Sequence, residues 1–378
     1  METAVENRME NPLGPYWIGF NLAKGIGPAR LRGLLDAFGD VKTAWEASMS
    51  DLRAAGLGKV TTERLVQLRS SIDIHALWDQ YRANGITILT WDDETYPKRL
   101  LETHQPPPVL YMRGALDPND HWAISIVGTR RVTQYGKQVT AQITRHLAQN
   151  GITIVSGLAR GVDAIAHQTA LDAGGRTLGV LGCGVDVIYP PEHRRIAEDM
   201  LAQGALISDF APGTPPDGPN FPARNRIISG LTQAVIVVEA GKRSGALITA
   251  EFALEQGREV FAVPGPITAP QSKGTNRLIK NGAHPLLDPS DVLEFLDLTR
   301  VTAQREARSL LPMTSLEEKL AESIADESLH VDEISIKTNI PIAQVTSTLT
   351  MMELKGMVQQ VGSMRYIALR EDQDEYQA

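Results

Sequence analysis

One stretch decides the fold of this chain: His121-Trp-Ala-Ile-Ser-Ile-Val-Gly-Thr-Arg-Arg131. Its first half, residues 123–127, is short, apolar and rich in β-branched side chains, which is typical of a buried strand. Apolar residues at helical spacing follow between residues 133 and 150, and a second apolar run occupies residues 152–155. A strand, a helix and a strand in this order predict one unit of a parallel sheet.

The same alternation continues as far as residue 298. Further strands are expected at residues 178–181, 205–209, 234–239 and 259–263, and helices near residues 162–173, 192–203, 226–231, 245–256 and 275–281. The pattern predicts an α/β fold, an extended Rossmann-like domain with a doubly wound parallel sheet. A short strand at residues 86–90 and a proline run that begins at Pro106 precede it, and we expect both to add a layer at the edge of this sheet.

The segment before the sheet domain has the pattern of short helices. A glycine turn, Gly25-Ile-Gly27, separates two apolar helical segments, and Pro28 opens the second. This arrangement resembles a helix-hairpin-helix (SAM-like) motif, and a weaker copy follows at residues 52–59. Because backbone N–H groups of such hairpins meet DNA phosphates, Lys24, Gly25 and Gly27 are candidates for a secondary DNA contact. The alternative is that the glycines only permit a tight turn between packed helices.

The segment after the sheet domain predicts a winged-helix domain. Three helical patterns, the last between residues 341 and 355, precede a hairpin that turns at Gly362-Ser363. The third helix has one base, Lys355, which Glu353 offsets, so we favour protein docking or dimerisation over binding in a DNA groove. The predicted divisions of the chain are residues 1–70, 71–298, a linker at 299–313, 314–372 and a disordered tail at 373–378.

The composition restricts what the protein can be. Its 378 residues suffice for two or three domains, and a formal net charge of −8 disfavours a simple basic nucleic-acid binder. Any phosphate site must therefore be a local basic patch. One cysteine, Cys183, argues against a disulfide scaffold and a cysteine-rich zinc site. No apolar segment has membrane-spanning length, so we expect a cytoplasmic protein without membrane, metal or cofactor.

Basic residues and glycines collect where the predicted strands end. Arg130 and Arg131 follow the first strand, and Arg160 follows the second. Ligands of parallel sheets bind beyond the carboxyl ends of the strands, and glycines let backbone N–H groups approach a phosphate closely, so we expect an anion site here. One such arginine alone is more simply a solvated surface residue, and the clustering is what favours a site. The candidate nucleic-acid-binding residues are Gly128, Thr129, Arg130, Arg131, Ser156, Gly157, Arg160, Arg224, Asn225, Arg226, Lys242, Arg243, Ser244, Gly245 and Lys273.

Common catalytic motifs are not matched. The glycine loops that follow the strands fit neither the G-x-G-x-x-G pattern of dinucleotide binding nor the spacing of a Walker loop. Asp163 and His167 lie four residues apart on one expected helix, where a metal or acid/base pair is conceivable. A first-turn acid and a core histidine explain them more simply, because no third ligand accompanies them. We therefore expect no catalytic residue.

Five motifs in the sheet domain carry a specific resemblance. They are Ser125-Ile-Val-Gly-Thr-Arg, Ser156-Gly-Leu-Ala-Arg-Gly-Val-Asp-Ala-Ile-Ala-His, Gly182-Cys-Gly-Val-Asp-Val-Ile-Tyr-Pro, Phe221-Pro-Ala-Arg-Asn-Arg-Ile-Ile-Ser-Gly-Leu, and Glu239-Ala-Gly-Lys-Arg-Ser-Gly-Ala-Leu-Ile-Thr-Ala followed by Val263-Pro-Gly. Together they resemble the DNA-processing protein A family (DprA, also called Smf). The hairpin helices and the winged helix also fit the layout of that family.

The resemblance implies a function. Members of the family bind single-stranded DNA, protect incoming strands during natural transformation and help to load the RecA recombinase on them, and the resemblance implies no catalytic activity. The resemblance also implies a homodimer joined through the sheet domain. It places the strand-binding pocket at residues 128–130, with Arg160, Lys242 and Arg243 at neighbouring basic positions.

A second hypothesis is an enzyme. The sheet type also resembles nucleotide-processing hydrolases that cleave the base from a nucleoside monophosphate (phosphoribohydrolases), which carry an arginine and a glutamate near a Pro-Gly-Gly-x-Gly-Thr loop. The corresponding loop here, residues 239–251, lacks Pro-Gly-Gly, which favours the binding protein. Aromatic residues are 5% of the chain, so we expect phosphate contacts to dominate over base stacking.

Overall fold

The computed structural model describes residues 11–296, 314–324, 329–354, 358–360 and 364–368. The chain divides into two compact units, Met1–Val292 and Leu293–Ala378. The expected linker at residues 299–313 and the expected tail at residues 373–378 lie outside the described residues, and the finer division of the chain stays a prediction.

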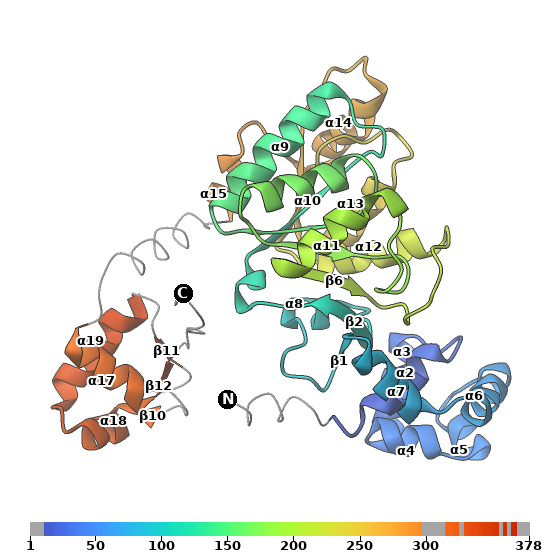
Figure 1. The fold of residues 1–378 in the computed structure, drawn as a ribbon, viewed down its shortest axis with the longest axis horizontal. Coiled ribbons are helices and arrows are strands. Elements are labelled where there is room, and N and C mark those ends of the chain that lie inside the picture. The colour runs from blue at the N-terminus through green and yellow to red at the C-terminus, as the bar shows by residue number, and fades with distance from the viewer. Residues whose placement is uncertain (1–10, 297–313, 325–328, 355–357, 361–363, 369–378) are drawn as a thin grey trace. The chain divides into compact units, whose positions relative to one another are not determined.

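A nine-stranded sheet, counted over the described residues, forms the centre of the first unit (Figure 1). Its strands are β1 (Thr87–Thr90), β2 (Val109–Gly114), β3 (Ala123–Val127), β4 (Thr153–Ser156), β5 (Thr177–Val180), β6 (Gly204–Ser208), β7 (Ala234–Val237), β8 (Glu259–Ala262) and β9 (His284–Pro285). They lie in the order β1-β2-β6-β5-β4-β3-β7-β8-β9. The strands from β3 to β9 are parallel, whereas β1 and β2 pair in antiparallel fashion at one edge, so the sheet is mixed but mostly parallel.

Helices cover both faces of this sheet, which is why its central strands β3 to β7 are buried along their whole length. Helices α9 (Gln134–Gln149), α10 (Val162–Asp172) and α11 (Arg194–Ala202) pack on one face, and α12 (Asn220–Gly230) and α13 (Gly245–Glu255) pack on the other (Figure 1). All five residues of β3 are buried. Burial on two faces excludes the alternation of polar and apolar residues that a half-exposed strand would show. The remaining helices of the domain are α8 (Lys98–Leu101), α14 (Lys273–Lys280) and α15 (Ser290–Phe295).

The predicted α/β fold is confirmed, and one helix boundary was wrong. Helix α12 begins at Asn220, six residues before the expected start at residue 226. Proline is tolerated in the first turn of a helix, so Pro222 does not prevent this early start. The consequence is that Arg224 and Asn225 lie within the first turns of α12 and not in a loop before it.

The N-terminal helices pack against the β1–β2 edge of the sheet. They are α2 (Gly14–Leu22), α3 (Pro28–Phe38), α4 (Val41–Glu46), α5 (Met49–Ala54), α6 (Lys59–Ser71) and α7 (Ile74–Ala83). One apolar core joins Trp17 and Phe20 of α2 to Tyr111 of β2. The Asn21 side chain connects the two parts, since it accepts a hydrogen bond of 3.0 Å from the Tyr111 hydroxyl and donates one of 3.2 Å to the backbone carbonyl of Asp209.

Two glycine turns in this region share one local geometry. Gly25 and Gly56 both have positive φ, of 95° and 90°, and an apolar residue follows each. Gly27 and Gly58 then form the N-caps of α3 and α6, and a Cβ atom at either position would meet nothing within 4 Å. The weaker copy seen in the sequence is therefore a second hairpin of the same kind.

The described part of the second unit has the winged-helix arrangement. Helices α17 (Ser315–Ser323), α18 (Val331–Thr338) and α19 (Ile342–Leu354) surround a core that includes Leu320, Ile334 and Leu349. Strands β10 (Leu329–His330), β12 (Arg365–Ala368) and β11 (Val358–Gln360) pair in antiparallel order beside them. The expected turn at Gly362-Ser363 and the base Lys355 lie outside the described residues.

Among the described residues, no helix combines the length and the apolar character that crossing a bilayer requires.

Candidate nucleic-acid interface

The order of the strands creates a crevice beside β3. From β3 the chain proceeds to β4, β5 and β6 on one side of the sheet, and β7, β8 and β9 lie on the other side. Loops that leave the carboxyl ends of β3 and β7 therefore diverge, and ligands of open α/β sheets bind at such switch points. A cleft of about 840 Å³ opens at this place.

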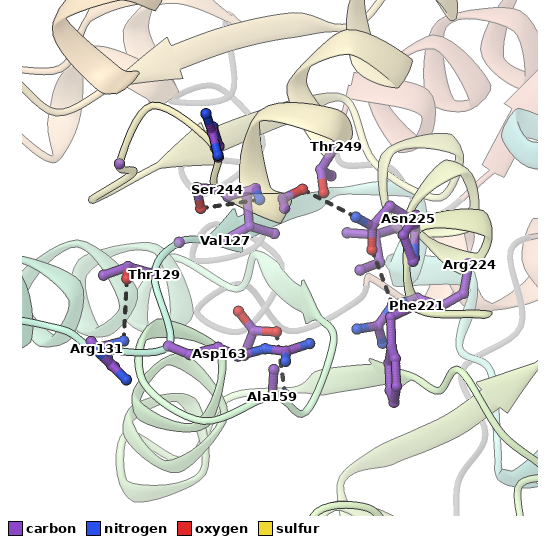
Figure 2. A pocket seen from close by; sticks show the side chains of 18 of the residues that line it. Val127, Thr129, Arg131, Ala159, Asp163, Phe221, Arg224, Asn225, Ser244 and Thr249 are labelled. Atoms are coloured by element: carbon purple, nitrogen blue, oxygen red, sulfur yellow. Dashed lines mark hydrogen bonds between the residues drawn. The ribbon is translucent and has the colours of Figure 1, made fainter. Parts of the chain in front are cut away.

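Several parts of the chain line this cleft, three of which supply the candidate residues, and Figure 2 shows how their side chains lie. The loop after β3 supplies residues 128–131, α12 supplies Phe221, Arg224 and Asn225, and the start of α13 supplies residues 243–246. Thr129 and Arg131 lie on one side in Figure 2, Phe221, Arg224 and Asn225 on the other, and Asp163 between them. Nine of the candidate residues therefore meet here: Gly128, Thr129, Arg130, Arg131, Arg224, Asn225, Arg243, Ser244 and Gly245.

The other six candidates lie elsewhere. Gly157 and Arg160 line a small hollow that shares Arg130, Ala159, Tyr189 and Phe221 with the cleft, and the Arg160 guanidinium pairs with Glu192 at 2.5 Å. The structure does not bring Ser156, Arg226, Lys242 or Lys273 to the lining of the cleft.

The side chains of these four residues lie or bind elsewhere. The Ser156 hydroxyl points into the sheet, where it donates to the Ile126 carbonyl at 2.6 Å. Arg226 pairs with Asp209 at 2.5 Å and donates to the Gln105 carbonyl at 2.9 Å, so its guanidinium is already occupied. Lys242 and Lys273 are exposed outside the lining residues.

Arg224 is the deepest cation of the cleft, with 4% of its surface exposed. Its Nη1 donates to the Gly157 carbonyl at 2.8 Å, and its Nε donates to the Asn225 side-chain oxygen at 3.2 Å. Burial lowers the pKa of Arg224 to about 10, and Asp163 opposes that change. The guanidinium is still charged at neutral pH, so it presents a desolvated positive charge to a ligand.

Glu239 accepts hydrogen bonds from the loop after β3. The Thr129 backbone N–H donates to the Glu239 carbonyl at 2.7 Å, and the Thr133 backbone N–H donates to the Glu239 carboxylate at 2.9 Å. Gly161 touches the same loop, because a Cβ atom there would lie 2.3 Å from the Thr129 carbonyl oxygen. These contacts give the loop one conformation, with Arg130 and Arg131 exposed.

The start of α13 adds backbone donors to the cleft. Ser244 is the N-cap of this 11-residue helix, and Gly245 is its first residue. The Ser244 side chain accepts the Ala246 N–H at 3.4 Å and the Ser244 carbonyl accepts the Leu247 N–H at 3.1 Å, so this end favours an anion through the Gly245 N–H and the positive end of the helix dipole. Among the described residues that line the cleft, four arginines face one carboxylate, that of Asp163. The cleft is thus a local basic site in an acidic chain.

Two aromatic rings were missed in the sequence. Tyr189 and Phe221 both line the cleft, with ring centroids 5.6 Å apart, and the Arg130 guanidinium lies 5.6 Å from the centre of the Phe221 ring. They come from segments 32 positions apart in the chain, so no local pattern joins them. The sequence did contain one indication of them, because each ring lies within one of the quoted motifs and is followed directly by a proline.

The residues considered for catalysis have structural partners. His167 is fully buried, and its Nδ1 lies 2.7 Å from the Thr177 hydroxyl. Glu251, the last residue of the loop compared with that of the hydrolases, is exposed and is not part of the lining of the cleft. In the described part of the chain, no three side chains of His, Cys, Asp or Glu gather where they could hold a metal ion.

The fold and the site together define an α/β protein with a basic cleft at the switch point of a Rossmann-like sheet. The chain matches the family model described as DNA recombination-mediator protein A over residues 87–297, and the DprA winged helix domain over residues 304–363. It is 37% identical to Protein Smf of Synechocystis over 395 aligned positions, which cover 95% of this chain and 99% of that protein. This chain belongs to the DNA recombination-mediator protein A (DprA/Smf) family.

Two solved structures are similar to this one. The X-ray structure of DNA processing protein A from Streptococcus pneumoniae has 33% sequence identity and a TM-score of 0.66, with 74% of this chain and 97% of that chain covered. DNA processing protein A from Helicobacter pylori, described for its single-stranded DNA binding mode, has 32% identity and a TM-score of 0.51, with 56% of this chain and 95% of that chain covered.

Proposed function

We propose that this protein binds single-stranded DNA in the cleft and that it is a binding protein without catalytic activity. The observation that carries the proposal is the meeting of Arg130, Arg131, Arg224 and Arg243 with the start of α13 at the switch point. Membership of the family supports it, and so does the single-stranded DNA binding described for the Helicobacter pylori relative.

The chemistry of the cleft favours a flexible single strand. Guanidinium groups and free N–H groups bind backbone phosphates of any sequence, so binding should be sequence-tolerant and sensitive to salt. The low aromatic content led us to expect little stacking. Tyr189 and Phe221 argue for one stacking position at the cleft, because an unpaired base can lie on such rings and a base within a duplex cannot.

Arg130→Ala is expected to weaken binding of a short single strand about tenfold, because it removes one charge-assisted phosphate contact. The slope of log affinity against log salt concentration should also become shallower by about 0.7 for one phosphate. Fluorescence anisotropy of a labelled oligonucleotide at two salt concentrations, with a duplex of the same sequence for comparison, measures both quantities.

Arg195→Ala is the matched control. The Arg195 side chain is 92% exposed on α11 and lies outside the cleft, so the variant loses the same charge without losing a cleft contact. Wild-type affinity for this control is expected. A wild-type protein that ignores single strands, or an Arg130→Ala variant that binds as the control does, would show that the cleft is not the DNA site.

The resemblance to the family extends the proposal to partners. We propose that the protein acts as a homodimer, that it protects incoming single strands in natural transformation, and that it helps to load RecA on them in the cytoplasm. Light scattering of the DNA-free protein measures its oligomeric state. The rate at which RecA nucleates on single strands, with and without this protein, measures loading.

The winged-helix unit fits protein docking better than binding in a DNA groove. Residues 342–354 of α19 contain no lysine or arginine, and the exposed positions include Ile342, Met351 and Glu353. A recognition helix without bases lacks the charge that phosphate contacts need. We propose that this unit, within the predicted residues 314–372, binds a protein.

The two hairpins are proposed as a second DNA contact, at Lys24, Gly25 and Gly27. Gly27→Asp should preserve α3, since aspartate is a favoured N-cap and the position is open, while it places a negative charge at the hairpin. We expect duplex binding by the whole protein to weaken at least threefold with single-strand binding in the cleft unchanged. Gly33→Asp, the same charge change on an open part of α3, is the control. Equal duplex affinity of both variants would leave the hairpins a packing role only.

A further inference from the structure

We propose that Asp163 is a positioning residue of the cleft, which holds the loop after β4 and the Arg224 side chain in their binding geometry without contacting DNA itself. The geometry of the loop supports the positioning role itself, and the expected effect on DNA binding rests on the proposed function. It gives a role to a buried carboxylate that the binding of phosphates does not use.

The loop between β4 and α10 depends on this carboxylate. Asp163 lies in the first turn of α10 with 6% of its surface exposed. Its Oδ2 accepts the Ala159 backbone N–H at 3.3 Å, and the Gly157 backbone N–H and the Ser156 side chain lie near enough to lower the pKa of the carboxyl against the rise that burial causes. Between Gly157 and Ala159, Leu158 has a φ of +57°, a conformation that residues other than glycine rarely adopt. A strained residue of this kind persists only where its surroundings hold it.

Arg224 of α12 contacts the same loop at a second point. It donates to the Gly157 carbonyl, and a Cβ atom on Gly157 would lie 2.2 Å from the Arg224 Nη2, so the guanidinium lies directly against the backbone. The loop is thus held at the Ala159 N–H by Asp163 and at the Gly157 carbonyl by Arg224. The opposite charges of the two side chains act on each other, since Arg224 lowers the pKa of Asp163 against the rise that burial causes.

A direct role in DNA binding would be unfavourable for Asp163. A carboxylate in the lining of the cleft repels phosphates, and burying a charge is costly unless hydrogen bonds and an opposite charge compensate it. Here the compensation is visible, in the Ala159 backbone N–H and the neighbouring Arg224. An acid in the first turn of a helix also stabilises the helix dipole, but that effect involves neither the loop nor Arg224.

Asp163→Asn tests the proposal, because asparagine keeps the shape of the side chain and loses its charge. We expect single-strand affinity to fall at least tenfold. In the DNA-free protein, the Ala159 amide should exchange hydrogen at least tenfold faster, with the amides of β4 and α10 unchanged. Asp172→Asn is the control, since Asp172 is an exposed aspartate at the end of the same helix.

A double-mutant cycle separates positioning from general destabilisation. If Asp163 acts through Arg224 and the loop, Asp163→Asn should change affinity less than twofold when Arg224→Gln is already present, whereas independent effects would multiply. Should Asp163→Asn fail to fold, Asp163→Glu is the second variant. It keeps the charge but moves the carboxylate by one methylene group, and it is expected to show the same loss of amide protection. Unchanged exchange at the Ala159 amide in the folded variant would overturn the proposal. A wild type that binds no DNA, together with faster exchange in Asp163→Asn, would refute the proposed function and leave the positioning of the loop standing.

Discussion

Gly161→Ala is expected to destroy the cleft and to lower the free energy of unfolding by about 2–4 kcal/mol. Gly161 has a φ of +81°, which an alanine adopts only with strain. The added Cβ would also lie 2.3 Å from the Thr129 carbonyl oxygen and 2.9 Å from the Arg130 backbone. Backbone cannot move aside as the end of a flexible side chain can, so the loop that carries Arg130 must shift. Single-strand affinity should therefore fall by more than tenfold.

Chemical denaturation and anisotropy titration of one preparation measure both effects. Gly174→Ala is the matched control, since Gly174 also has a positive φ, of 70°, but a Cβ atom there would meet nothing within 4 Å. The control should show the conformational strain, about 1 kcal/mol, and keep wild-type affinity. If both variants lose the same stability and neither loses affinity, the contact between Gly161 and the loop does not shape the cleft.

The stability of the protein is expected to fall by about 2 kcal/mol between pH 7.5 and pH 5 because of His167. Burial lowers the pKa of His167 from its ordinary value of 6.5 to about 3. In the unfolded chain the histidine takes up a proton as the pH falls below 6.5, while in the folded protein it stays neutral. Its contribution to stability is therefore fully present above pH 6.5 and is lost as the pH falls from 6.5 towards 3.

Denaturation of wild type and His167→Gln at several pH values tests this expectation. Glutamine does not titrate, so the variant should be less stable at pH 7.5 but should lose about 2 kcal/mol less on acidification. Burial raises the pKa values of Asp163 and Asp209, which changes stability in the opposite sense, so only the difference between the two proteins isolates the histidine. The exposed His104, changed to glutamine, is the control. Parallel pH profiles for wild type and His167→Gln would contradict the prediction.

The order of elements and the type of sheet followed from local patterns. Strand β3 was predicted with its observed bounds, because five consecutive apolar or small residues bounded by a glycine have few alternatives to a buried strand. The collection of arginines and glycines at one edge followed as well, since carboxyl ends of parallel strands must meet at the same edge. Nine of the fifteen candidates for the main site lie in the cleft for this reason.

The direction of individual side chains depended on the tertiary structure. Arg224 and Arg226 lie two positions apart in α12, about 200° around the helix, so one lines the cleft while the other pairs with Asp209. The helix was expected to start after Arg224, and without its true start at Asn220 the two arginines could not be told apart.

The sequence by itself therefore determined the sheet, its edge and the charge collected there. Only the tertiary structure decided which charges point into the cleft, which rings stand beside them and which buried carboxylates hold its loops. Tyr189 and Phe221 meet although 32 positions separate them, and Asp163 accepts the Ala159 backbone N–H beside Leu158, whose φ is positive. The physical reason is that periodicity reports burial along one element, whereas a binding site is made of contacts between elements.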